Sequence, residues 1–247
     1  GSEASLSRHF IAVSNQVERA VAFGVDPSLI LPMLDGVGGR YSVWSAVGLS
    51  LAIMIGMSQF KQFLAGAHAM DQHVQQADYA VNMPVILALL DIWYGNFYQI
   101  NNRAVISYSQ YLEYFPSYLQ QLSMESQGKC VTNQGVPIDY ATGLIIWGGV
   151  GSNSQHSFHQ LLMQGTQKTC IDFILPAQHP SGQVNSALVA HCLAQSRALM
   201  CGSNTDEQAS YQKIAGNVPS NTLIMDCLDP YSLGSLIALY EHKVFVQ

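Results

Sequence analysis

Short apolar runs alternate with helix-like segments along the second half of the chain, and this alternation restricts the possible folds most. The runs predict buried strands at Leu144–Trp147, Ile171–Leu175 and Thr222–Leu228. The segments between them predict helices at Ser154–Gln164 and Val184–Met200. Strands joined by helices form parallel sheets that need cover on both faces, so the sequence predicts an α/β fold with a parallel sheet between helices.

The rest of the chain carries further elements with their own start and stop signals. They are a strand at Phe10–Ser14, a tight turn at Gly148–Gly151, a polar loop at Ser203–Ser220, and helices at Gln16–Ala22, after Ser42, at Pro84–Tyr98, at Ser109–Met124 with a kink at Pro116, and at Leu233–Val246.

Charged residues make up only 11% of the chain and hydrophobic residues 49%. Soluble domains usually have about 25% charged residues, so we expect a partner subunit or further sequence to cover much of this surface. The net charge of −6 argues against nucleic-acid binding, which needs a basic face. The apolar runs Val43–Met57 and Pro84–Tyr98 fall short of the ~20 residues of a membrane span, so no membrane association is expected.

The cysteines are five in number and widely spaced, at Cys130, Cys170, Cys192, Cys201 and Cys227. They form no C-x-x-C pair, so neither a disulfide framework nor a zinc ribbon is indicated. Buried, reduced thiols in a cytoplasmic protein are the expectation.

A single arginine follows a glycine-rich turn in the stretch Asp35-Gly-Val-Gly-Gly-Arg-Tyr-Ser42. Gly38 and Gly39 would let the backbone approach a ligand, and Ser42 would cap the following helix. Arg40 and the helix N-terminus would then border one space, which suits an anion or an oxyanion. The alternative is a turn whose arginine only covers a helix end, and the local pattern does not separate the two.

Glu125 lies near the expected end of the helix that follows Ser109, four residues after Gln121. If the helix persists, the two side chains share one face. A carboxylate is disfavoured at the negative end of a helix, which makes it a better proton acceptor and suits a general base. The alternative is a solvated loop glutamate.

His156 follows a predicted strand and a glycine turn and would lie in the first turn of a helix. Parallel α/β sheets bind ligands beyond the carboxyl ends of their strands, so the position suits acid–base work. Acting as an acid would need a carboxylate partner, and none is evident from the sequence. A histidine bonded to nearby backbone is the alternative.

His68, Asp71 and His73 invite a metal hypothesis, but on a helix the two histidines point about 140° apart. A zinc site usually adds a third protein ligand, so we expect no metal. Neither G-x-x-x-x-G-K-[ST] nor a strand-linked G-x-G-x-x-G occurs, and no nucleotide or other cofactor is expected.

Five segments together resemble the glucose-6-phosphate isomerase family, in that family's order and across essentially the whole chain. They are Asp35-Gly-Val-Gly-Gly-Arg-Tyr-Ser-Val-Trp-Ser-Ala-Val-Gly48, Gly66-Ala-His-Ala-Met-Asp-Gln-His73, Met124-Glu-Ser-Gln-Gly-Lys129, Gln155-His-Ser-Phe158 and Tyr240-Glu-His-Lys-Val-Phe-Val-Gln247.

The resemblance implies an αβα sandwich of the sugar-isomerase (SIS) type that works as a homodimer on phosphorylated hexose in glycolysis and gluconeogenesis. Residues 1–107 would be the end of a first SIS domain with linking helices, and residues 108–247 a second SIS domain. Family members are roughly twice this length, so the chain is expected to be incomplete at both ends and inactive alone. The phosphate loop and the catalytic lysine would lie outside it.

The resemblance also implies roles for individual residues. Glu125 would be the base that moves a proton between C2 and C1 of the open-chain sugar, and Arg40, next to Gly39, would stabilise the enediolate. His156 would assist ring opening from the neighbouring subunit, and Gln121, Gly39 and Arg40 would contact the substrate. These roles agree with the local chemistry of each side chain. Gly149 stands where the family usually has a glutamate.

Two rival functions remain at this point. A sugar-phosphate-binding module of the same fold would bind hexose phosphate without catalysis, although binding alone needs no base. A metal-dependent hydrolase built on His68, Asp71 and His73 would lose function with a chelator, and its geometry is poor.

Overall fold

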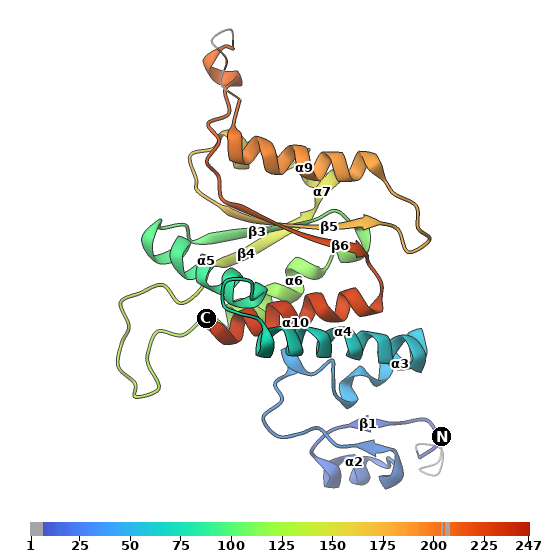
Figure 1. Cartoon of the computed structure of the whole chain (residues 1–247). Coiled ribbons are helices and arrows are strands. Elements are labelled where there is room, and N and C mark those ends of the chain that lie inside the picture. Colours follow the sequence, from blue (N-terminus) through green and yellow to red (C-terminus); the bar gives the residue numbers. More distant parts are fainter. Residues whose placement is uncertain (1–6, 204, 206–207) are drawn as a thin grey trace. The chain divides into compact units, whose positions relative to one another are not determined.

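The computed structural model describes residues 7–203, 205 and 208–247 (Figure 1). Its contacts divide the chain into two compact units, residues 1–64 and 65–247. The predicted domain boundary lay at residues 107 and 108, inside the second of these units. Strand β3, Asn102–Ser107, ends at that position and pairs with strands on both sides, so it belongs to the same sheet as the residues that follow. The assignment of the two segments to two SIS domains stays a prediction.

The first unit contains a small parallel sheet of two short strands, Ala12–Val13 (β1) and Ile30–Leu31 (β2). Helix α2, Val17–Phe23, connects them and ends at Gly24, whose φ of 105° is the left-handed conformation that glycine favours. The predicted first strand and helix are therefore confirmed. The other elements are η1 (Pro27–Leu29), η2 (Gly39–Tyr41), η3 (Ala46–Gly48), α3 (Leu49–Ile55) and the first residues of α4 (Met57–Gln76).

The second unit contains a parallel sheet of four strands in the order β4-β3-β5-β6. Besides β3, its strands are β4 (Ile145–Val150), β5 (Cys170–Gln178) and β6 (Ser220–Cys227). The helices are α5 (Met83–Phe97), α6 (Phe115–Leu119), α7 (Gly151–Ser154), α8 (His159–Gln164), α9 (Ser186–Cys201) and α10 (Pro230–Val246). Figure 1 shows α7 and α9 on one face of the sheet and α5, α6 and α10 on the other. These layers confirm the predicted α/β fold and its parallel sheet.

Side chains alternate across the sheet and give its two faces different chemistry. Ala104, Ile106, Ile171 and Phe173 form a buried apolar cluster with residues of α8 and α9, such as Leu199. The intervening residues of β3 and β5 include Arg103 and Asp172, both fully buried, which bond to residues of α5 and α10. The apolar face fixes the sheet against α9, and the polar face fixes it against α10.

The predicted helix over Ser109–Met124 is broken into three short helices of different kinds. A 3-10 turn at Gln110–Leu112 is followed by α6 and then by a π-helix, η5, at Gln120–Glu125. Pro116 lies in the first turn of α6, where its missing amide hydrogen costs no helical bond. The kink prediction was wrong because the helix begins at the proline instead of bending there.

The predicted turn at Gly148–Gly151 is also wrong, since β4 continues to Val150 and Gly151 begins α7. A Cβ built on Gly148 would lie 1.9 Å from the carbonyl oxygen of Val105 on the neighbouring strand. Gly148 thus belongs in the strand because only glycine permits this approach at its φ of 155°.

The cysteine expectation holds for only part of the set. All five cysteines are free thiols, but Cys170 and Cys192 alone are buried, whereas Cys130 and Cys201 are exposed. Burial raises the pKa of both buried thiols to about 12. The predicted loop at Ser203–Ser220 is largely irregular, with a short 3-10 turn, η6, at Ser210–Gln212. Asn204, Asp206 and Glu207 lie outside the described residues.

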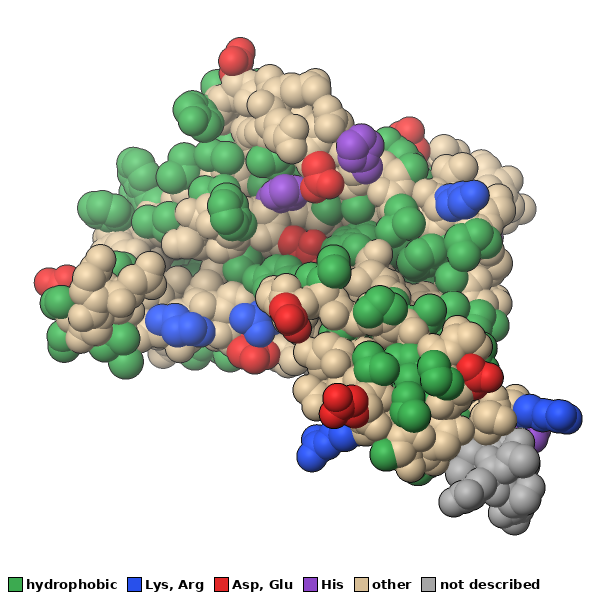
Figure 2. All heavy atoms as spheres, turned by 90° about the horizontal axis from the view of Figure 1, so that it is seen from below, with side chains coloured by type: hydrophobic (Ala, Val, Ile, Leu, Met, Phe, Trp, Pro, Cys, Tyr) green, Lys and Arg blue, Asp and Glu red, His purple; other side chains and the backbone are tan. Residues whose placement is uncertain are grey.

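Large apolar side chains reach the surface in both units, and Met54 and Phe97 are 83% and 77% exposed. The space-filling view in Figure 2 shows green apolar side chains between few charged ones. This exposure agrees with the low charge content of the chain, while the partner expected to cover it stays a prediction.

Candidate functional site

Glu125 is the last residue of the π-helix η5, and two contacts hold this helix against strand β4. The Gln120 side-chain amide donates to the Ile146 carbonyl over 3.0 Å, and the Ile146 amide donates to the Met124 sulfur over 3.4 Å. Ile146 is near the start of β4, so Glu125 lies at the amino-terminal edge of the sheet.

Gln121 and Glu125 are both exposed and stand four residues apart in this helix. In a π-helix each bond spans five residues, so one turn takes slightly more than four residues. The spacing therefore still leaves the two side chains about one turn apart, although the predicted helix type was wrong.

The end of η5 is held by its own hydrogen bonds. The Lys129 ammonium donates to the carbonyls of Glu125 and Ser126 over 2.8 and 3.2 Å. The Ser126 hydroxyl donates to the Leu122 carbonyl over 2.6 Å, and the Gly128 amide donates to the Met124 carbonyl over 2.9 Å. These bonds satisfy carbonyls that a helix end otherwise leaves open, and they place a positive charge at its negative end. Glu125 thus projects from a fixed backbone.

The last residue of the chain connects this helix end to the protein interior. The Gln127 side-chain amide donates to the side-chain oxygen of Gln247, whose own amide donates to Asp91 over 3.0 Å. Lys243, one turn earlier in α10, has its ammonium 2.6 Å from the same Asp91 carboxylate. A cavity of about 440 Å³ lies beside this junction and is bordered by Gln127, Lys129 and Gln247 among others.

Asp91 belongs to a buried network of charges that the sequence did not predict. The Arg103 guanidinium contacts the carboxylates of both Asp91 and Asp172. Asp172 also accepts hydrogen bonds from Tyr240 over 3.0 Å and from Asn221 over 2.8 Å. Two cations, Arg103 and Lys243, thus face two carboxylates, so the network is neutral overall and satisfies the condition under which charges tolerate burial.

The network shifts the protonation equilibria of its members. Burial alone would raise the pKa of Asp91, but the charges of Lys243 and Arg103 outweigh it and the pKa is lowered. Burial would likewise lower the pKa of Arg103, yet the carboxylates of Asp172 and Asp91 raise it. Burial, and then the carboxylate of Asp172, raise the pKa of the Tyr240 phenol. Each of these three shifts favours the usual charge state of its group at neutral pH.

His156 is exposed and lies in a turn between α7 and α8. Its backbone amide donates to the Asn153 carbonyl over 3.2 Å, so it follows the end of a short helix. The predicted position inside the first turn of a helix was wrong. α7 follows β4 directly, so His156 lies beyond the carboxyl end of that strand, as expected.

Arg40 and Gly39 lie in the first unit, within the 3-10 turn η2. Neither Gly38 nor Gly39 has a positive φ, and a Cβ on Gly39 would meet open space. The guanidinium carbon of Arg40 lies 5.3 Å from the centre of the Tyr41 ring. The structure thus keeps Arg40 half-buried beside an open backbone segment.

The prediction that Ser42 caps the following helix was wrong. Its hydroxyl donates back to the Gly39 carbonyl over 2.6 Å and closes η2. The next helical turn is instead capped by Ser45, whose side chain accepts from the Val47 amide. The predicted anion site needed a helix that begins at Ser42, next to Arg40. No helix begins there, so this prediction was wrong.

The residues of the metal hypothesis have other partners. Asp71 lies 2.6 Å from His242 of α10, and the His73 ring nitrogen accepts a hydrogen bond from the Met83 amide over 3.1 Å. His68 is exposed. Within the described part of the chain, no group of three or more His, Cys, Asp or Glu side chains could hold a metal ion.

A second cavity contains none of the predicted site residues. It measures about 560 Å³ and lies beyond the carboxyl ends of β3, β5 and β6. Only its general location could be expected from the sequence, because the sequence predicts a parallel sheet and parallel sheets bind ligands at this edge.

Comparison with known proteins decides the family. The family model described as phosphoglucose isomerase matches residues 1–247. The chain belongs to the phosphoglucose isomerase family.

Relatives of this family match over the whole chain. Glucose-6-phosphate isomerases of Hahella chejuensis and Pseudomonas fluorescens are 50% and 51% identical, and each alignment covers 100% of this chain and 48% of the relative. A crystal structure of a glucose-6-phosphate isomerase from Chlamydia trachomatis has a TM-score of 0.88 at 37% identity, over 98% of this chain and 48% of that one. The chain therefore spans about half the length of the relatives it matches. In the described residues, no helix has the length and apolarity of a membrane span.

Proposed function

We propose that the whole protein interconverts glucose 6-phosphate and fructose 6-phosphate through an enediolate intermediate, in the cytoplasm and as part of glycolysis and gluconeogenesis. The observation that carries this proposal is Glu125, an exposed carboxylate on a helix end fixed by Lys129, Ser126 and the Gln127–Gln247 contact. A proton moved between neighbouring carbons needs such a base, held in one place at the substrate. Family membership supplies the substrate class.

The other site residues take the roles that their chemistry allows. Gln121, about one turn before Glu125, contacts the sugar, and Glu125 carries the proton between C2 and C1. Arg40, with Gly39 leaving the backbone open beside it, stabilises the negative charge of the enediolate. His156 assists ring opening as an acid or base.

His156 acts on the substrate of a second copy of the chain, so the enzyme works as a homodimer. Glu125 and His156 of one chain lie at opposite edges of the same sheet, separated by the length of β4. Six residues of strand span roughly 17 Å, much more than one hexose can bridge by hydrogen bonds. A site that needs both side chains therefore combines two subunits.

The full-length protein tests this function by its reaction with glucose 6-phosphate in heavy water. Formation of fructose 6-phosphate with deuterium at C1, and appearance of deuterium at C2 of the glucose 6-phosphate that re-forms, are the expected results, because the base exchanges its proton with solvent during the transfer. Binding of the sugar phosphate without exchange would instead indicate the non-catalytic binding module. The 247-residue chain alone should show negligible turnover, since it spans half of its relatives.

A further inference from the structure

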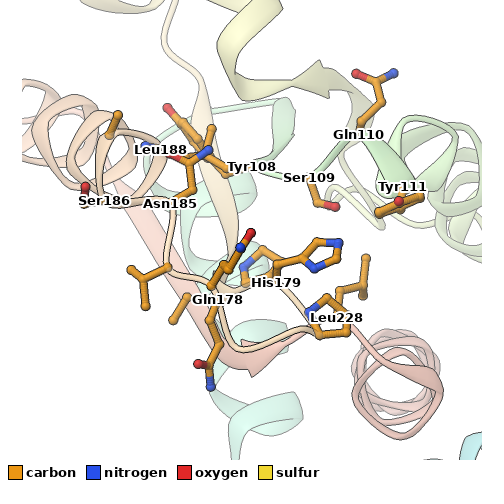
Figure 3. Close-up of a pocket in the computed structure, with 16 residues that line it drawn as sticks. Tyr108, Ser109, Gln110, Tyr111, Gln178, His179, Asn185, Ser186, Leu188 and Leu228 are labelled. Atoms are coloured by element: carbon orange, nitrogen blue, oxygen red, sulfur yellow. Dashed lines mark hydrogen bonds between the residues drawn. The ribbon is translucent and has the colours of Figure 1, made fainter.

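The cavity of about 560 Å³ lies where open parallel sheets bind ligands. Figure 3 shows its lining, with Ser109 and Tyr111 from the segment after β3, Gln178 and His179 from the end of β5, Asn185 before α9, and Leu228 after β6. Its volume falls within the roughly 300–1,000 Å³ of small-molecule sites. Every lining residue belongs to the second unit.

The topology marks the same place. β3 and β5 are neighbours, yet the chain leaves β3 through α6 on one face of the sheet and leaves β5 through α9 on the other (Figure 1). Connections that diverge in this way open a crevice at the carboxyl ends of the two strands, the switch point at which doubly wound folds bind ligands.

This cavity is separate from the proposed catalytic base. Glu125 lies beside Ile146 at the amino-terminal edge of the sheet, whereas the cavity lies beyond Ser107 and Gln178 at the carboxyl edge. His156 follows the carboxyl end of β4 but does not line the cavity. A ligand bound there would leave Glu125 untouched.

The lining carries many hydrogen-bonding groups and no charge. None of the lining residues is Asp, Glu, Lys or Arg. Besides His179 and the phenols of Tyr108 and Tyr111, the polar side chains are hydroxyls and amides, namely Ser109, Gln110, Gln178, Gln183, Asn185 and Ser186. Two of these amides already have a partner, since Gln110 donates to Glu113 and the Asn185 oxygen accepts from the Leu188 amide. An ionic ligand would find no counter-charged side chain here, whereas a neutral ligand with several hydroxyls would find donors and acceptors in number.

The His179 ring adds one more hydrogen-bond donor, its Nε2–H, because its Nδ1 is bonded to Ser181. Its Nδ1 accepts the Ser181 amide over 3.2 Å and lies 2.9 Å from the Ser181 hydroxyl. A ring nitrogen that accepts carries no proton, so the proton of the neutral ring is on Nε2, which then donates. At the rim, the Tyr111 side chain is 81% exposed and offers an apolar ring face beside these polar groups.

We propose that this cavity is a second binding site of the protein and that it takes an uncharged sugar or polyol. Amide and hydroxyl side chains bond the ligand hydroxyls, the His179 Nε2–H donates to one oxygen, and the Tyr111 ring packs against the C–H face of the sugar. No chemical step occurs there.

Titration of the full-length protein with isotope-labelled glucose, followed by NMR, tests the site. Unlabelled glucose 6-phosphate at saturating concentration keeps the proposed catalytic site filled, and saturable binding of glucose should persist. Gln178→Leu and Tyr111→Ala should each weaken this binding at least tenfold. Tyr114→Ala is the matched control, because Tyr114 is a 77% exposed tyrosine of the same segment that does not line the cavity.

Three results would overturn the proposal. They are the absence of saturable glucose binding, binding that survives both cavity variants, and displacement of glucose by inorganic phosphate, which would indicate an anion site. The two cavity variants test the location of the glucose site independently of the proposed isomerase function. If the full-length protein is an isomerase, unchanged turnover of the variants shows that they are folded.

Discussion

Glu125 and His156 stand at opposite edges of one parallel sheet, Glu125 beside the start of β4 and His156 beyond its end. Two groups so placed are too far apart to act on one sugar from the same chain, so under the proposed function each active site of a homodimer would join Glu125 of one copy to His156 of the other.

This arrangement predicts complementation between two inactive variants of the full-length protein. A heterodimer of Glu125→Gln and His156→Ala has one site with both changes and one site with neither. Random reassembly of an equal mixture should therefore restore roughly a quarter of the wild-type activity, since half of the dimers are mixed and each has one intact site. Activity no higher than that of the separate variants would show that both residues serve the site of their own chain.

Arg40 is predicted to act on the transition state. Arg40→Gln should lower kcat by about 10²–10³-fold and leave KM little changed, because the proposed enediolate charge exists only during the reaction. Arg40→Lys keeps the charge without the planar fork and should recover part of the loss. Steady-state kinetics separate this role from a phosphate anchor, for which KM would rise at constant kcat.

Asp91 is predicted to be a large contributor to stability because two buried cations depend on it. Asp91→Asn leaves Lys243 and Arg103 undercompensated and should lower the free energy of unfolding by about 3–5 kcal/mol. Asp226→Asn, at an exposed position, should change it by less than about 0.5 kcal/mol. Urea denaturation of both variants measures the difference.

The contribution of the Asp91 carboxylate to the free energy of unfolding should depend on pH, and the sign of this dependence follows from its pKa shift. Because the folded state lowers the pKa of Asp91, its contribution is fully present above the unfolded value of about 3.9 and is lost as the pH falls through the folded value. The gap between wild type and Asp91→Asn should therefore shrink below about pH 4. A gap that stays constant there would contradict the role assigned to the charge.

Gly148 and Gly149 provide a matched pair within β4. A Cβ on Gly148 would meet the Val105 backbone at 1.9 Å, while a Cβ on Gly149 would only touch the Phe158 ring at 4.0 Å. Gly148→Ala should destabilise the protein by about 3 kcal/mol or more, and Gly149→Ala by less than about 0.5 kcal/mol. Equal melting temperatures for the two variants would show that the strand has room at both positions. Position 149 thus has room for a Cβ.

The strands and most helices could be predicted from the sequence because their signals are local. The run Ile171–Leu175 lies within β5, and Gly202 ends α9 as its position indicated. The errors arose where tertiary contacts override local patterns. The glycines after Trp147 suggest a turn, but the approach of Val105 places them in a strand. The π-helix that ends at Glu125 could not be predicted, because no pattern of residue spacing in the sequence distinguishes it from an α-helix.

The buried network could not be predicted because its members are far apart along the chain. Asp91 and Lys243 come from α5 and α10, and Arg103 and Asp172 from neighbouring strands. One local hint exists, since an aspartate inside the apolar run of β5 must find a cation in the core. For the candidate site, the residue types and the roles implied by the family resemblance could be read from the sequence, whereas the separation of Glu125 from His156 required the fold.

Glu125→Gln in the full-length protein tests the central claim most directly. The amide keeps the size of the side chain and removes its ability to take a proton, and Glu113→Gln, an exposed glutamate of the same segment, serves as the control. Isomerisation and deuterium exchange at C2 of glucose 6-phosphate should both fall by roughly 10²–10⁴-fold in Glu125→Gln, with sugar-phosphate binding retained. Turnover near the wild-type level in Glu125→Gln would contradict the assignment of Glu125 as the base.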